Sequence, residues 1–451
     1  MSRIQPINWY VEDNHLEFHL IDVGEGLMTL IIFPDNKVML FDCNVTDDNE
    51  EHILLYLDNV IPEVFNIENE EFEKPIDIFA NSHRDEDHYR GLKKIHEKFP
   101  IKSIWDSGQS GATTSSSSYE YYMRLRRTLR AKDLKNLFVP TPSNISLGSF
   151  GGVNIYCLAT AEDFIKDFIN EGLYKAEAKI QHTNSMVLML EYKGRKLLMT
   201  GDSDWKSWKE KIVPNFNDGD FLKSEILIAS HHGSRSFFTD EENDEIDEEA
   251  NPDTTFTDSI KLISPTITLI SCGKYETAHH PNKKAMNLYT EYTSNEQVFT
   301  TNLKGNLIGF IDQEGYYSVT PSRFKNNSNA ANNIGFIIKC EQIRNGQKSI
   351  VENGSTLITG CNLKFTIDTY GGIIEPFNEV SVYWEVSNGG KFNHHEHQEI
   401  YYKGKDENDG LLTFTRELAY EGTHLLRCRM HNKKKGYNVT KIFVVKGILE
   451  T

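Results

Sequence analysis

The first part of the chain alternates short apolar runs with polar breaks. From Leu16 it reads LEFHLIDVGEG and then LMTLIIFPDNKVMLFDCN, with interruptions at Gly24 and at residues 34–36. Runs of this length that are rich in Ile, Val, Leu and Phe and end at turn residues predict β-strands. We therefore expect an N-terminal hairpin region that joins a mixed sheet.

Helical and strand patterns then follow one another as far as residue 320. Two stretches favour helices, at residues 51–60 and 119–131. Strands mixed with helices are typical of an α/β sandwich. Further strands are predicted at residues 153–157, 186–192, 196–199, 225–229 and 266–270.

A different pattern begins after residues 322–333, a polar, asparagine-rich stretch that indicates a domain boundary. Beyond it, residues 334–451 read as short strands separated by turns, at spacings typical of a β-sandwich. The sequence therefore predicts an α/β domain at residues 15–321, a linker at residues 322–333 and a small all-β sandwich at residues 334–451.

Composition narrows the class of protein. With 451 residues the chain is too long for one compact core, and 38% hydrophobic and 25% charged residues are ordinary for a globular protein. No apolar run reaches the ~20 residues that cross a bilayer, and the N-terminal residues lack a secretory pattern. We therefore expect a cytoplasmic protein without a membrane partner.

Charge and cysteine content argue against two kinds of site. The net charge of −18 disfavours a broad basic DNA-binding face, although local basic patches stay compatible with it. The six cysteines are scattered without a C-x-x-C pair, which disfavours a disulfide scaffold and a thiolate zinc site.

Potential metal ligands crowd the segment NSHRDEDH at residues 81–88, directly after the apolar run at residues 76–80. Imidazole and carboxylate at this density favour a divalent cation around which the backbone turns. The alternative is a charged, solvated loop. The potential ligands are His83, Asp85, Asp87 and His88.

Two later strands end in the same kinds of residue. The run LLMT is followed by Gly201 and Asp202, where a carboxylate is well placed to bridge two metal ions. An aspartate that caps the next helix explains this position equally well. The run ILIAS is followed by His231 and His232. A single histidine is usually structural, but a tandem pair after two similar strand ends favours a metal site.

The order H-x-D-x-D-H, T-G-D and H-H-G-S resembles that of the metallo-β-lactamase superfamily, and looks closest to its ComEC-like branch. Supporting strings are IDVGEG at residues 21–26, NSMVL at residues 184–188, SCG at residues 271–273 and HP at residues 280–281. The resemblance covers roughly residues 16–320 and implies the αββα sandwich of that superfamily.

Carried over position by position, the resemblance implies two divalent metal ions, Zn²⁺ or Mn²⁺, that activate a bridging water. It makes Asp202 the bridging carboxylate, and it places Asp85 where a second histidine is more usual, which shifts the preference toward Mn²⁺. The sequence departs from the family at Leu27 and Asn44, neither of which is a ligand position. The implied ligands are His83, Asp85, Asp87, His88, His182, Asp202 and His231.

Two residues are predicted to take part in catalysis. Asp87 stands beside His88 at the second metal position, where its carboxylate would help to activate the water. His280, near the family's active-site rim, would contact a substrate phosphate or protonate a leaving group. The alternative for His280 is a surface histidine beside a turn proline, Pro281.

The ComEC-like resemblance implies a phosphodiesterase that acts on nucleic acid, and one local pattern agrees with it. The helix predicted at residues 119–131 carries arginines next to aromatic residues, an arrangement that can hold single-stranded nucleic acid. A solvated helix face is the alternative. The residues concerned are Arg124, Arg126, Arg127 and Arg130, with Tyr121 and Tyr122.

The C-terminal part carries a second set of motifs. LKF, WEVSNGG and AYEGTH resemble the L-x-F, W-x-V-x-N-x-G and Y-x-G-x-H motifs of the adenylyl/guanylyl-cyclase and SMODS C-terminal (AGS-C) sensor family, over roughly residues 354–447. The resemblance implies that Trp384, Tyr420 and His424 contact a nucleotide second messenger, whereas from the pattern alone a strand tryptophan or histidine is ordinarily structural. Residues 391–392 depart from the family's usual pair.

These inferences combine into one functional hypothesis and two rivals. We expect a metal-dependent nuclease effector of bacterial antiphage defence, whose C-terminal domain binds a cyclic or linear oligonucleotide signal and controls the degradation of nucleic acid. The first rival is a phosphodiesterase that destroys the signal itself. The second is a non-catalytic binding protein, against which the full set of ligands argues. The oligomeric state is open, and a homo-oligomer is possible.

Overall fold

The structure is a computed structural model that describes residues 15–66, 71–108, 116–161, 182–241, 246–273, 280–321, 336–344, 346–369, 380–389, 397–399, 413–419, 421–432 and 437–449. The chain divides into two compact units, one made of Glu12–Leu55 and Pro75–Asn327 and the other including Tyr56–Lys74 and Ser328–Thr451. The predicted linker at residues 322–333 lies outside the described residues, so the domain boundaries stay a prediction.

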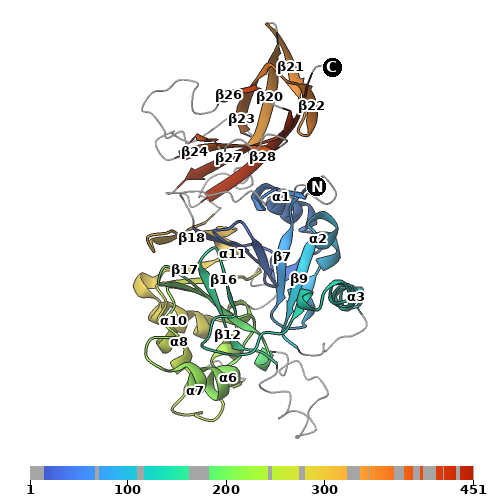
Figure 1. The fold of residues 1–451 in the computed structure, drawn as a ribbon. Helices are drawn as coiled ribbons and strands as arrows, with labels where there is room; N and C mark the ends of the chain where they lie inside the picture. Colours follow the sequence, from blue (N-terminus) through green and yellow to red (C-terminus); the bar gives the residue numbers. More distant parts are fainter. Residues whose placement is uncertain are drawn as a thin grey trace. The chain divides into compact units, whose positions relative to one another are not determined.

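An eight-stranded mixed sheet forms one layer of the first unit (Figure 1). The apolar runs that open the sequence supply three of its strands, which pair antiparallel, whereas β3, β7 and β9 run parallel. The strand order is β10 (Leu137–Phe138), β9 (Ile101–Asp106), β7 (Ile76–Asn81), β3 (Val38–Phe41), β2 (Thr29–Ile32), β1 (Leu16–Leu20), β18 (Leu307–Ile311) and β19 (Tyr317–Pro321).

A seven-stranded sheet forms the second layer, and its last four strands run parallel. The strand order is β11 (Gly148–Phe150), β12 (Val153–Ala159), β13 (Val187–Tyr192), β14 (Arg195–Met199), β15 (Ile226–Ile228), β16 (Ile267–Ile270) and β17 (Val298–Thr300).

Strand β13 is apolar at successive positions because both of its faces are covered. Leu188 and Leu190 belong to the core between the two sheets, together with Phe18 and Phe41 of the first sheet. Val187 and Met189 point the other way, because successive side chains of a strand face opposite sides. They pack among residues of η3 (Trp208–Ile212), α7 (Val213–Phe216), α8 (Asp258–Ile263) and α10 (Lys283–Tyr292).

Helices also cover the outer face of the first sheet. Phe79 of β7 faces away from the central core, and its ring meets that of Tyr122 at a centroid distance of 6.3 Å. Tyr122 belongs to α3 (Ser117–Lys132), which lies beside α2 (Leu92–Lys98) and against β9 (Figure 1). The remaining elements of the first unit are β4 (Cys43–Asn44), β8 (Tyr89–Arg90), α6 (Trp205–Ser207) and α11 (Thr301–Lys304). Helix α1 (Glu50–Val60) crosses the division between the units, and β5 (Val64–Asn66) and β6 (Glu71–Glu73) fall in the other unit.

The described strands after residue 335 form two sheets with one core between them. Phe365 and Phe414 of the first sheet pack with Trp384, Leu426 and Phe443 of the second. The first sheet has the order β21 (Gln347–Val351), β20 (Phe336–Arg344), β23 (Cys361–Thr369) and β26 (Thr413–Leu418). The second has the order β22 (Ser355–Ile358), β28 (Tyr437–Ile448), β27 (Gly422–Asn432), β24 (Val380–Gly389) and β25 (His397–Glu399).

The expectation of a mixed α/β chain is confirmed. The helices predicted at residues 51–60 and 119–131 are α1 and α3, and the strands predicted between residues 153 and 270 are β12 to β16. Among the residues that the structure describes, no helix is long and apolar enough to cross a membrane.

Strand β1 carries a buried charged group opposite the core. His15, Glu17 and His19 share one face of the chain because side chains two residues apart point the same way. Glu17 lies 3.2 Å from His15 Nε2 and 2.8 Å from His19 Nε2. Burial alone would raise the pKa of Glu17, but hydrogen bonds from the two rings and their positive charge lower it to about 2.

We predict that the Glu17 carboxylate stabilises the fold above pH ~4.5 and that this contribution disappears as the pH falls toward 2. A pKa depressed from 4.5 to about 2 corresponds to a free energy on the order of 3 kcal/mol. The free energy of unfolding of wild type and of Glu17→Gln, measured by denaturant titration at pH 5 and pH 3, should therefore differ more at pH 5. An equal difference at both values would contradict the prediction.

Candidate metal centre

The candidate ligands follow the ends of strands that meet at one edge of the first unit. β7 is followed by residues 82–88, which include the short helix η1 (Glu86–His88), and β14 is followed by residues 200–204. β15, which runs parallel to β14, is followed by η4 (Ser230–Gly233). His182 precedes β13, which is antiparallel to β14. This topology explains why residues far apart in sequence converge.

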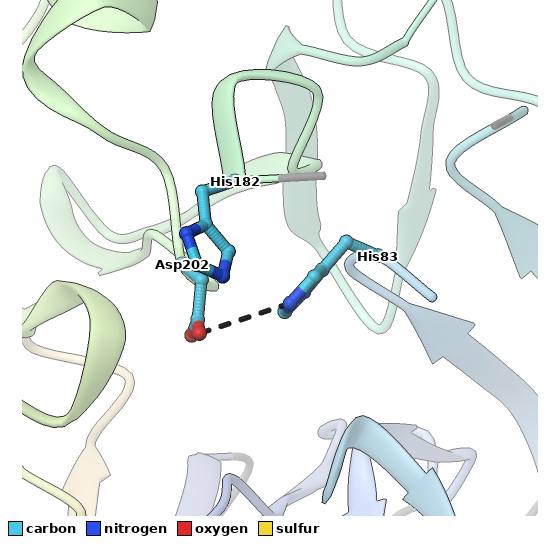
Figure 2. A group of neighbouring side chains, drawn as sticks. All are labelled: His83, His182 and Asp202. Carbon is cyan, nitrogen blue, oxygen red and sulfur yellow. Dashed lines mark ion pairs between the residues drawn. The ribbon is translucent and has the colours of Figure 1, made fainter. Parts of the chain in front are cut away.

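One group of candidate ligands consists of His83, His182 and Asp202, whose ligand atoms all lie within 4.8 Å of one another. Figure 2 shows the side chains turned toward a common space, with His83 Nε2 3.7 Å from Asp202 Oδ2. Asp85 borders the same space, because its Oδ2 lies 3.4 Å from His83 Nε2 and 3.1 Å from His182 Nε2.

A second group consists of Asp87, His88 and His232. Asp87 Oδ2 lies 3.4 Å from His232 Nε2 and 3.8 Å from His88 Nε2. The two groups are neighbours, because the rings of His83 and His88 are 4.1 Å apart between centroids.

Asp202 borders both groups. Its Oδ1 lies 3.3 Å from His88 Nε2 in the second group, and its Oδ2 lies 3.7 Å from His83 Nε2 in the first. Oδ2 also lies 3.7 Å from His231 Nε2 and 3.9 Å from His232 Nε2. A carboxylate whose two oxygens face different groups has the geometry of a bridging ligand.

The donor atoms of both groups fit divalent cations. Nε2 of His83, His88 and His232, and Oδ1 of Asp202, are buried without a hydrogen-bond partner. Such atoms are costly unless something satisfies them. Two ligands that each lie ~2.1 Å from a tetrahedral ion are roughly 3.4 Å apart, and the separations given above between 3.3 and 3.9 Å match this spacing.

The outward-facing nitrogens of the histidines are held by neighbouring groups. His88 Nδ1 lies 2.8 Å from Asp42 Oδ2, and His231 Nδ1 lies 2.8 Å from Ser236 Oγ. His232 Nδ1 lies 3.2 Å from the carbonyl oxygen of Ser271. Contacts of this kind orient each ring and leave Nε2 to face the centre.

Backbone strain accompanies the tandem histidines. His231 and His232 have φ angles of 48° and 55°, in the left-handed region that non-glycine residues rarely adopt. Such conformations persist where the surroundings fix them, and they cluster at functional sites. Here the sharp turn sends both rings toward Asp202.

The carboxylates and histidines of the centre shift one another's pKa values. Burial alone would raise the pKa of Asp202, but the positive charge of nearby histidine rings holds it well below its usual range. Burial alone would lower the pKa of His88, but the carboxylates of Asp202, Asp87 and Asp42 raise it well above its usual value. The raised pKa means that the His88 ring holds a proton readily. Protons and metal ions compete for histidine nitrogens, so a cation bound here would displace such a proton.

His280 lies at the border of the centre. Its Nδ1 is 2.6 Å from Glu25 Oε1, and its ring centroid is 5.4 Å from that of His231 and 6.0 Å from that of His232. Glu25 also accepts a hydrogen bond from the backbone N–H of Gly273. The structure thus brings both predicted catalytic residues, His280 and Asp87, close to His232.

The structure brings together all the residues predicted to bind metal, with one difference of emphasis. His232, which sequence reasoning did not select, joins Asp87 and His88, whereas His231 lies between Asp202 and the rings of His182 and His280. The only sequence signal for His232 was its position directly after His231. Asp42 and Glu25 were also missed, because nothing in the local pattern distinguishes a carboxylate that holds a distant histidine. The roles of all these residues as ligands stay a prediction.

The predicted sensor residues lie in a different environment. Trp384 is fully buried, its ring stacks on Phe414 at 5.7 Å, and its indole N–H has no hydrogen-bond partner. His424 is buried, at the register position opposite Asn388. Tyr420 lies outside the described residues. Contact of these residues with a nucleotide stays a prediction.

Comparison with known proteins identifies the C-terminal part. Residues 316–445 match the model of the Adenylyl/Guanylyl and SMODS C-terminal sensor domain family, which confirms the expected sensor domain. The chain is also 25% identical over 144 residues to ComE operon protein 3 of Bacillus subtilis (strain 168). That alignment covers 31% of this chain and 15% of the relative, so the chain matches only a small part of the length of that protein.

We predict that His232→Ala weakens metal binding more than His231→Ala. His232 Nε2 belongs to a three-ligand group, so its loss leaves only Asp87 and His88 there besides the shared Asp202, and affinity should fall at least ~10-fold. Titration of Mn²⁺ and Zn²⁺ by calorimetry measures this directly. His52→Ala, on α1, serves as the control and should bind like wild type. A larger loss for His231→Ala would reverse the assignment.

Proposed function

We propose that the first unit is a metallo-β-lactamase-type phosphodiesterase with two divalent cations, and that it degrades nucleic acid. The observation that carries the proposal is Asp202, whose two oxygens border both groups of unsatisfied histidine nitrogens. The two face-to-face sheets with helices outside, and the partial similarity to ComE operon protein 3, support the same superfamily.

The proposed ligands divide into two sets that share Asp202. His83, Asp85 and His182 would hold one cation, and Asp87, His88 and His232 the other. Asp85 adds a carboxylate oxygen, which favours Mn²⁺ relative to an all-histidine set. When bound, the cations supply Lewis acidity for a phosphoryl oxygen and lower the pKa of a water.

Residues of this chain prepare the site for hydrolysis. Asp42 fixes the His88 ring by accepting from Nδ1, so that Nε2 stays aimed at the centre. Glu25 holds His280 in the same way at the border, where its Nε2 would face a substrate. A histidine in this position would donate a proton to the leaving oxygen as the phosphodiester bond breaks.

We propose further that a nucleotide second messenger bound at the C-terminal sensor domain controls this activity, as part of bacterial antiphage defence. The family match at residues 316–445 supports a nucleotide ligand. The buried, unsatisfied indole N–H of Trp384 is a donor that a polar ligand atom would satisfy. Control requires the ligand to bind active and inactive states with different affinities.

We predict that Asp87→Ala lowers hydrolysis below a tenth of the wild-type rate while the melting temperature stays close to that of wild type. The substitution removes one ligand and one acidic group at the water-activating position. The assay is Mn²⁺-dependent cleavage of plasmid, single-stranded DNA and cyclic dinucleotides, which also separates a nuclease from an enzyme that destroys the signal.

Glu86→Ala is the matched control, because Glu86 is the adjacent carboxylate and pairs with Arg90 at 3.8 Å instead of facing the centre. It should retain near wild-type activity. If Asp87→Ala keeps more than a tenth of the rate with metal in excess, the ligand assignment fails. If wild type cleaves none of the substrates, the enzymatic proposal fails.

We predict that at least one member of a panel of cyclic and linear nucleotides changes the cleavage rate of the full-length protein and raises its melting temperature. When its free concentration is 100 times the dissociation constant, a ligand that binds only the folded state stabilises that state by about 2.7 kcal/mol. The same rate across the panel, with no shift in melting temperature, would refute nucleotide control and favour a role for the sensor domain in binding a protein partner.

A further inference from the structure

One stretch of the chain reverses the overall charge. Residues 90–135 contain eleven Lys and Arg against four Asp and Glu, a local charge of +7 in a chain whose net charge is −18. The stretch contains α2, β9 and α3. The net charge of this stretch is therefore opposite in sign to the net charge of the whole chain.

Most of these basic side chains reach solvent and lie on neighbouring elements. α2 and α3 pack side by side (Figure 1), and His96 of α2 lies close enough to Lys132 and Lys102 that burial and their charge together lower its pKa. We call the exposed members the basic face: Lys93, Lys98, Lys102, Arg124, Arg127, Arg130, Lys132 and Lys135.

Only part of the predicted arginine cluster belongs to this face. Arg126 and Tyr122 point inward, because Asp106 at the end of β9 forms an ion pair with Arg126 and accepts a hydrogen bond from Tyr122. Arg124 stays outside, with its guanidinium 5.0 Å from the centre of the Tyr121 ring. An arginine beside a partly exposed aromatic ring suits both a phosphate and a nucleobase.

A buried ion pair ties this face to the candidate metal centre. Arg84, between the ligands His83 and Asp85, donates from Nη2 to both oxygens of Asp106 at 2.8 and 3.0 Å. Arg126 of α3 contacts the same carboxylate at 2.8 Å. Asp106 is fully buried, so breaking this pair would strand charges in the interior. Helix α3 therefore has a fixed position beside the metal-binding loop.

We infer that the basic face of α2 and α3 binds the phosphate backbone of a single-stranded nucleic acid and leads it to the metal centre. The inference rests on the proposed nuclease function and adds to it the surface that holds the substrate. Screening makes the face effective despite the acidic chain, because the Debye length is ~8 Å at physiological salt. The 16 residues of α3 span ~24 Å, so a strand along it is governed by the local charge.

The test is binding of a fluorescein-labelled 20-nucleotide single-stranded DNA to the full-length protein in EDTA, at several salt concentrations. The triple variant Arg124→Gln, Arg127→Gln, Arg130→Gln removes three exposed charges from α3. Because each phosphate contact on a single strand contributes about 0.7 to the slope of log K against log salt, the slope should fall by about 2. Affinity at physiological salt should fall about tenfold or more.

The matched control is Lys193→Gln, Lys223→Gln, Lys261→Gln, which removes three exposed charges from other surfaces of the first unit. It should bind like wild type. An unchanged affinity and slope for the arginine variant, or an equal loss for the control, overturns the inference. Equally tight binding of a polyglutamate of matched charge overturns it too, because the face would then recognise any polyanion.

Wild-type hydrolysis of bis(p-nitrophenyl) phosphate with Mn²⁺ separates this inference from the proposed function. That substrate is too small to need the basic face. If the protein hydrolyses this substrate but its DNA binding does not depend on salt, the inference about the basic face fails and the proposed enzymatic function stands. DNA binding that depends on Arg124, Arg127 and Arg130, without any hydrolysis, supports the surface and refutes the enzyme.

Discussion

The burial of one carboxylate determines the arrangement of the whole candidate metal centre. Asp202 lies within 4 Å of the Nε2 atoms of four histidines, which come from two different segments of the chain. A buried ion costs several kcal/mol unless partners compensate it, so these segments must meet at Asp202 for the fold to be stable. The two sheets supply that meeting point, because the strands that carry the segments end at a common edge.

Carboxylates outside the centre orient the side chains and the backbone of this cluster. Asp42 holds Nδ1 of His88 and thereby directs Nε2 of the same ring toward Asp202. Asp106 does the corresponding work for the backbone between His83 and Asp85 by holding Arg84. Both carboxylates are fully buried. The centre therefore contains two kinds of group. The candidate ligands face inward with donor atoms that lack hydrogen-bond partners, and the surrounding carboxylates hold those ligands in orientation.

Charge is distributed unevenly over the molecule, and the distribution is consistent with the proposed chemistry. An acidic chain repels polyanions at most of its surface, whereas the basic face would attract them where α3 lies beside the loop that carries the candidate ligands. The sensor domain adds a separate apolar core around Trp384 and Phe414. A nucleotide bound there would influence hydrolysis only by favouring one of two states of the protein.

The sequence by itself determined the kinds of element and most of the candidate ligands. Apolar runs that end in His83, Asp202 and His231 are readable because strand patterns and ligand chemistry are both local properties. What only the tertiary structure decided is which atoms face one another. The left-handed turn at His231 and His232 brings His232 into the group with Asp87, and no local pattern encodes that choice. The same holds for Asp42, Glu25 and Asp106, whose side-chain partners His88, His280, Arg84 and Tyr122 lie between 16 and 255 residues away. A carboxylate's partner depends on which strand ends are neighbours, and strand pairing across the sheet is a property of the whole chain.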